Sequence, residues 1–226
     1  MKLLTYLAEI GRLLKPHRTI PKTPWTATSR WSVNLKNLPI LFFGLAIFGI
    51  GDALLIQSTI GNSPWSVFAQ GLSLRTPLSV GEATAITSIA VLLLWIPLKE
   101  RPGFGTLANI AIIAIGIQVG VTIFPSQNSY PLGILYCLLG IAMVGIGSSL
   151  YITCGLGPGP RDGLMTALHN KTGVRIGRVR LAIEGTVLVA GALLGGTVGL
   201  GTLLFAILIG QSIAISLGVV SRLSAK

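Results

Sequence analysis

The sequence has little charge, and most of the charge it has is of one sign. Only 10% of its 226 residues are charged, with 17 Lys and Arg against 6 Asp and Glu, whereas about 25% of an ordinary globular domain is charged. Hydrophobic residues make up 51% of the chain, and the mean hydropathy is +0.79. Because so few charged side chains cannot cover the surface of a soluble domain, we expect lipid to be the main solvent of this chain. This composition argues against a soluble enzyme and against a disordered protein.

Cysteine and histidine are also scarce. Cys137 and Cys154 lie 17 residues apart in one apolar stretch, so they cannot pair within a helix and do not have the spacing of metal ligands. His17 and His169 stand alone, and the chain has no P-loop, no His-Glu-x-x-His motif and no Cys-x-x-Cys motif. We therefore expect no disulfide scaffold, no metal, no cofactor and no enzymatic activity.

The first 37 residues form a basic segment, in which seven Lys and Arg are opposed only by Glu9. The pattern predicts either an amphipathic helix at the membrane surface, ended by Pro16, or a partly ordered cytosolic tail. The apolar face of such a helix would consist of Leu3, Leu4, Leu7, Ile10, Leu13 and Leu14.

Six long apolar stretches follow, each close to the roughly 20 residues that span a bilayer core. They cover residues 39–58, 79–98, 106–124, 132–153, 179–195 and 202–221. The segments around them place 16 of the 17 Lys and Arg on one side of the membrane and only Arg75 on the other. By the positive-inside rule, both termini are cytoplasmic. The basic excess is then a signal of topology, and no nucleic-acid partner is needed to explain it.

The two halves of the chain repeat each other. A shift of 96 residues brings residues 44–117 into register with the second half at 21 identities, where apolar bias alone predicts roughly six to eight. Each copy holds three of the six stretches, and this odd number inverts the second copy in the membrane. We expect an all-α membrane protein of six transmembrane helices in two inverted three-helix repeats, over 38–130 and 131–226. This arrangement is typical of secondary transporters and of some channels.

The repeated segment Gly61-Asn-Ser-Pro-Trp-Ser-Val-Phe-Ala-Gln-Gly-Leu72 resembles that of the bacterial YczE/YitT-type integral membrane proteins. Their motif has a Gly, then Pro-Trp-Asp, then a short helix that ends in Gly-Leu. The first copy keeps Pro64 and Trp65 with Ser66 in place of Asp, and the second keeps Pro160 and Asp162 with Arg161 in place of Trp. The resemblance spans most of the chain and implies a bacterial inner-membrane protein with about six spans. It implies no reaction.

Both motif copies have the sequence of a helix start. Ser63 and Gly159 suit the N-cap, and the proline that follows each suits the first helical position. If the short helices re-enter the membrane, their N-termini would offer N–H groups and partial positive charge to an anion. If they lie flat on the membrane surface, they are only amphipathic connectors. The residues expected to bind solute in the first case are Asn62, Ser63, Trp65, Arg161 and Asp162.

Three further polar residues lie inside the apolar stretches. Asp52 is an acid in a span, where a charge costs on the order of 3 kcal/mol. It is either a structural acid that is protonated or bonded to a serine, or a site that couples transport to a proton or cation, and its counterpart in the repeat is Ser148. Gln118 and Gln211 either join helices by hydrogen bonds or contact solute.

Two functions are compatible with the sequence. The first is a secondary transporter of a small polar solute, an anionic one included. The second is a membrane accessory or assembly protein that binds a partner through its cytoplasmic surface, formed by residues 1–37 and 161–178. The expected partners are the lipid bilayer and, for a transporter, the solute, and a homodimer is compatible with either function.

Overall fold

In the computed structural model, residues 15–17 and 19–224 are described, and these fold into helices without any strand. The amphipathic helix expected near the N-terminus lies outside the described residues. The helices are α2 (Asn37–Gln57), α3 (Pro64–Arg75), α4 (Val80–Leu93), α5 (Trp95–Leu98), α6 (Phe104–Ile123), α7 (Tyr130–Thr153), α8 (Pro160–Thr172), α9 (Ile176–Leu193) and α10 (Leu200–Ser224).

Five of the six expected stretches form helices that are long and apolar enough to cross a membrane. They are α2, α6, α7, α10 and the segment Val80–Leu98, in which α4 and the short α5 follow one another. The sixth stretch lies in α9, whose 18 residues include Arg178, Arg180 and Glu184. This charge sets α9 apart from the other five helices, so the sixth span stays a prediction.

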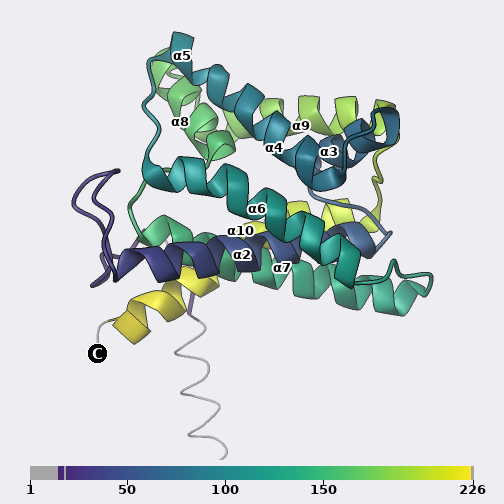
Figure 1. Ribbon diagram of the computed structural model, residues 1–226, viewed down its shortest axis with the longest axis horizontal. Helices are drawn as coiled ribbons and strands as arrows, with labels where there is room; N and C mark the ends of the chain where they lie inside the picture. The colour runs from purple at the N-terminus through teal and green to yellow at the C-terminus, as the bar shows by residue number, and fades with distance from the viewer. Residues whose placement is uncertain (1–14, 18, 225–226) are drawn as a thin grey trace, which may run out of the picture.

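The helices form two layers (Figure 1). The long helices α2, α6, α7 and α10 pack together in one layer, and α3, α4, α8 and α9 form the other, with α4 packed on α6. The two short helices lie near opposite ends of the second layer, α3 against α9 and α8 against α4.

Glycines bring α2 and α7 close together. A Cβ atom on Gly51 would lie 2.9 Å from the carbonyl oxygen of Gly140, and one on Gly44 would lie 3.1 Å from that of Gly147. Small residues of this kind allow helix backbones in a membrane to approach closely and gain van der Waals contact. The α2–α7 pair is therefore the central contact of the first layer.

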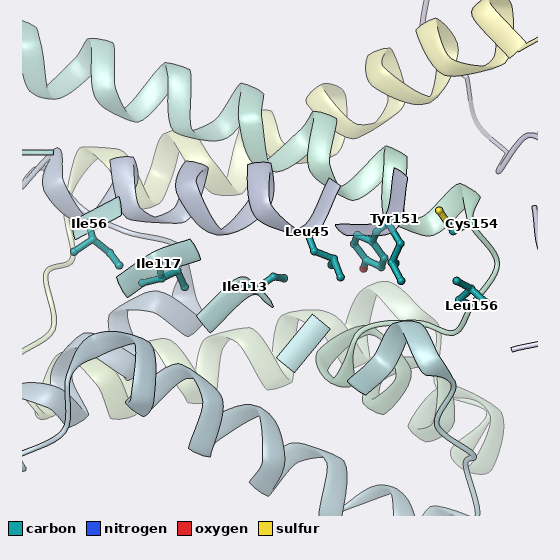
Figure 2. Close-up of a cluster of buried hydrophobic side chains, with 8 residues drawn as sticks. Leu45, Ile56, Ile113, Ile117, Tyr151, Cys154 and Leu156 are labelled. Atoms are coloured by element: carbon teal, nitrogen blue, oxygen red, sulfur yellow. The ribbon is translucent and has the colours of Figure 1, made fainter. Parts of the chain in front are cut away.

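A cluster of buried apolar side chains lies where α2, α6 and α7 meet (Figure 2). Leu45 and Ile56 of α2 and Ile113 and Ile117 of α6 belong to this cluster, which continues past Tyr151 to Cys154 and Leu156. These residues pack α2, α6 and α7 against one another, and Tyr151 also lines the cavity described below.

The helix starts recur at the offset found in the sequence. Three pairs of helices begin 96 residues apart. They are α3 and α8, which begin at Pro64 and Pro160, α4 and α9, which begin at Val80 and Ile176, and α6 and α10, which begin at Phe104 and Leu200. The backbone turns before the short helices also match, with φ of 124° at Gly61 and 111° at Gly157. Only glycine adopts these angles without strain.

Candidate functional site

A cavity of about 580 Å³ lies between the two layers. Both motif copies and several helices of each layer contribute to its wall. Its polar and charged lining includes Asp52, Ser63, Trp65, Ser88, Asn109, Ser148, Tyr151, Arg161, Asp162 and Glu184. The volume is in the range of pockets that hold small molecules.

The first turns of α3 and α8 meet at this cavity. Ser63 caps α3 by accepting a hydrogen bond from the Ser66 N–H, and Gly159 caps α8. The guanidinium carbon of Arg161 lies 5.1 Å from the centre of the Trp65 ring. Trp65 and Arg161 hold the same position in the two copies, directly after the proline. The positive ends of two helix dipoles therefore lie beside one cavity.

Packing from the neighbouring helices holds α8 in this position. The indole N–H of Trp95, at the start of α5, donates to the carbonyl oxygen of Pro160 at 3.0 Å. Trp65, Val91, Trp95 and Leu164 form an apolar cluster behind the two helix starts. The cluster thus fixes the first turn of each short helix against α4.

Arg161 has unused hydrogen-bonding capacity. Its side chain is half-buried and lines the cavity, and across the part of the chain that the structure describes it forms no hydrogen bond or ion pair. The ring of Trp65 stabilises its charge through a cation–π contact. The five N–H donors of the guanidinium are therefore available to a ligand in the cavity.

Asp52 also lacks full hydrogen bonding. Its side chain is 1% exposed, Oδ1 accepts from the Ser63 hydroxyl at 3.4 Å, and Oδ2 has no partner among the described residues. The indole Nε1 of Trp65 is likewise buried without a partner. Burial disfavours the charged form of Asp52 and is the larger effect, while the positive charge of Arg161 partly offsets it. Buried polar groups are nearly always hydrogen-bonded, so two buried atoms without partners in the same cavity wall as Arg161 indicate a place for a ligand.

The other charged side chains in the wall are paired. The hydroxyl of Tyr151 donates to Oδ2 of Asp162 at 2.8 Å. Arg180 Nε lies 3.0 Å from Glu184 Oε1, which is the local ion pair that their spacing on one helical face predicts. These contacts leave Arg161 and Asp52 as the charged groups with capacity for a ligand.

Three residues expected at the site lie elsewhere. Asn62 Nδ2 donates to Gln70 Oε1 at 2.8 Å, outside the cavity lining. Gln118 Oε1 accepts from the Gly81 N–H at 3.2 Å and so joins α6 to α4. Gln211 is exposed on α10. The structure brings the other five, Asp52, Ser63, Trp65, Arg161 and Asp162, to the cavity.

Several lining residues were not expected from the sequence. Tyr151, Asn109 and Ser88 are single polar residues in apolar stretches, and nothing in their spacing sets them apart. Ser148 could have been found, because it is the repeat counterpart of Asp52. Among the residues described, no three His, Cys, Asp or Glu side chains gather in a way that could hold a metal ion.

An all-helical chain with five helices of membrane-spanning length is a multi-pass membrane protein. Residues 35–217 match a family described as a family of unknown function (DUF6198), and the chain belongs to this family. An uncharacterized protein of Haemophilus influenzae is 43% identical over 92% of this chain and 96% of its own. The uncharacterized membrane protein YczE of Bacillus subtilis is 36% identical over 83% of this chain and 85% of its own. The resemblance to YczE-type proteins is thereby confirmed.

A third relative is more distant. The uncharacterized protein YyaS of Bacillus subtilis is 27% identical over 79% of this chain and 91% of its own. No solved structure matches the chain. The relatives assign the chain to a membrane-protein family, and none of their names states an activity.

Proposed function

We propose that this protein is a secondary transporter of a small polar solute, which binds in the cavity where α3 and α8 meet. The observation that carries the proposal is that the guanidinium of Arg161 and Oδ2 of Asp52 line one cavity and have no hydrogen-bond or ion-pair partner among the described residues. Substrate sites of secondary transporters lie between inverted repeats, where the N-termini of broken or short helices face the solute. The cavity has these components.

Contacts between equivalent residues support the inverted repeat. A shift of 96 residues exchanges the Gly44–Gly147 contact with the Gly140–Gly51 contact. The Gly105 N–H donates to Leu156 O at 2.8 Å, and the Gly201 N–H donates to Ile60 O at 2.8 Å, which is the same bond in the other copy. A pseudo-twofold axis relates such pairs. Equivalent residues that touch each other lie near it, as Trp65 and Arg161 do.

The sixth span of this arrangement is α9. Its 18 residues are about 27 Å long at the helical rise, close to the thickness of the hydrocarbon core. The ion pair between Arg180 and Glu184 lowers the cost of placing both charges near the membrane. With six spans, both termini face the cytoplasm, and the bilayer is the inner membrane that the YczE resemblance implies.

The position of Arg161 argues against an accessory role as the main function. That role assigns residues 161–178 to a partner-binding surface, whereas Arg161 lines the cavity. In a transporter, α3 and α8 are the re-entrant helices of the sequence analysis. Their N-termini contribute about half a positive charge each to the solute site.

Solute-induced thermal stabilisation of the purified protein tests the proposal. We expect at least one solute in a panel of small metabolites to raise the unfolding temperature, because a ligand that binds only the folded state stabilises it. The same solute should accumulate in proteoliposomes that contain the protein. The Arg161→Gln variant should lose both effects, whereas the control Arg178→Gln, altered at a residue outside the cavity lining, should keep them. A protein that no solute stabilises and that transports none is not a transporter of this class.

A further inference from the structure

The charges that face the cavity divide into paired and unpaired groups. Arg180 is paired with Glu184 at 3.0 Å, and Arg30 is paired with Glu100 at 2.6 Å. On α8, Asp162 accepts from Tyr151 and lies in the first turn, where the helix dipole favours an acid. The lining residues from α3, α4, α6 and α10 are uncharged: Pro64, Trp65, Ser88, Asn109, Ile113, Phe205, Ile209 and Ile213. Arg161 and Asp52 are therefore the charged lining residues left with neither an ion-pair partner nor a bond to Tyr151 in the described part of the chain.

The guanidinium of Arg161 selects the sign of the solute. It is permanently charged, and its planar fork matches the two oxygens of a carboxylate. It would repel a cation in the same space. The indole N–H of Trp65, buried without a partner beside it, is a second donor for an anion oxygen. Together with the two helix N-termini, these donors suit one small anion.

Arg161 needs an anion as its partner, whereas the carboxylate of Asp52 needs a positive charge or a proton. It is buried in α2, has one long hydrogen bond from Ser63, and has the charge of Arg161 as its counter-charge. When an anion binds Arg161, this counter-charge is neutralised, and the carboxylate of Asp52 is left buried without compensation. A proton on Asp52 removes that cost and gives Oδ2 a hydrogen to donate.

We propose that the cavity binds a small organic monocarboxylate on Arg161 together with one proton on Asp52, so that the two are transported together. The proposal rests on the transport function above and adds its solute class and coupling ion. One O–H bond forms on Asp52 as one O–H bond of a hydronium ion breaks and leaves water, on the side from which the solute enters. The charges of the anion and the proton sum to zero, so the occupied and empty cavities have the same net charge. The protein can then change between its inward-facing and outward-facing states at similar electrostatic cost with or without solute.

Binding calorimetry on the purified full-length protein tests the coupling. Lactate, pyruvate and benzoate are the carboxylate probes, choline is the cationic probe and glucose the neutral one. Titration in two buffers of different ionisation enthalpy gives the number of protons taken up per ligand. We expect a carboxylate to bind with about one proton, and its affinity to fall about tenfold per pH unit where Asp52 ionises, because the two ligands are linked.

Two variants separate the roles of the two residues. Asp52→Asn should bind the same carboxylate without proton uptake and with an affinity that no longer depends on pH, because the amide resembles the protonated acid. Arg161→Gln should lose at least tenfold in affinity. Glu82→Gln is the matched control, since Glu82 lies in an exposed capping box at the start of α4 and Gln suits that box. It should keep both the proton uptake and the pH dependence.

The results that would contradict the coupling, the solute class and the transport function differ from one another. A carboxylate that binds without proton uptake, or with the same uptake in Asp52→Asn, overturns the coupling and leaves the transport function in place. Binding of choline or glucose with no binding of any carboxylate overturns the solute class only. If a broad metabolite panel also gives no binding and no uptake, the transport function itself is wrong. An elution volume and unfolding temperature close to those of the wild type show that each variant is folded.

Discussion

At the scale of single residues, the cavity stands out because some of its polar groups have no partner among the described residues. Elsewhere Gln118 is bonded to Gly81 and Thr106 to Pro158, and among the described residues Asn62 Oδ1 is the one other buried side-chain atom without a partner. Among the described residues, Arg161, Asp52 and Trp65 each have polar atoms without a partner, and those of Asp52 and Trp65 are buried. Leaving such atoms buried costs about 1–3 kcal/mol each. A bound solute removes this cost, so their concentration at one place favours a binding site over a structural network.

The fork of Arg161 gives a prediction at this scale. Arg161→Lys keeps the positive charge and loses the planar pair of donors, so a carboxylate should bind at least several-fold more weakly. Arg178→Lys, outside the cavity lining, should have almost no effect, because Lys serves the positive-inside rule equally well. Affinities from solute-induced shifts in unfolding temperature check both. Equal affinity in Arg161→Lys and Arg161→Gln would remove Arg161 from the site and leave it as a signal of topology.

The same residues show what the sequence could predict. Asp52 was predictable because an acid in an apolar stretch is costly, and Trp65 and Arg161 because they follow a repeated helix start. The position of Gln211 was not, because α10 is apolar around most of its circumference and its sequence does not show which face is buried. Tyr151 was missed because its role depends on Asp162 in another helix.

At the scale of elements, close helix packing depends on glycine at particular contacts. A Cβ on Gly147 would lie 2.7 Å from the backbone nitrogen of Phe48, so α2 and α7 would have to separate. A Cβ on Gly185 of α9 would meet nothing within 4 Å. Sequence predicted the helix starts well, because proline and N-cap residues mark them locally. It did not distinguish these two kinds of glycine, because the contact involves a distant segment.

The two glycines therefore predict effects of opposite sign. Gly147→Ala should destabilise the protein by about 1–3 kcal/mol through overpacking. Gly185→Ala should be neutral or stabilise it by up to about 1 kcal/mol, because alanine has the higher helix propensity. Unfolding temperatures in one detergent give the comparison. A drop of the same size in both variants would contradict the close α2–α7 contact.

At the scale of the whole molecule, the two sides of the cavity differ although the repeats match. Beyond the central residues, the lining continues to Gly155, Pro158 and Arg30, on the side that the Lys and Arg distribution predicts to be cytoplasmic. On the other side, Gln70 Oε1 accepts from Asn62 Nδ2 and from the Thr197 N–H, both at 2.8 Å. The counterpart of Gln70 is Thr166, which donates only to Asp162 O of its own helix within the described part of the chain. Under the proposed transport function, we infer an inward-open state in which the hydrogen bonds of Gln70 close the outer side.

Removing this gate should expose the cavity to the outside. Gln70→Ala deletes the acceptor that ties α3 to Asn62 and to the α9–α10 connection, so the outward-open population should rise. A cysteine replacing Ser148 in the lining should then be labelled several-fold faster by a membrane-impermeant thiol reagent added outside. Thr166→Ala is the matched control and should not raise the outside rate. Cysteines replacing Ser126 and Ser224 mark the two faces, which the six-span arrangement places on opposite sides, and labelling of both from one side would contradict that arrangement. Unchanged labelling at position 148 in Gln70→Ala would show that Gln70 is a structural link and that the outer side is closed by packing alone.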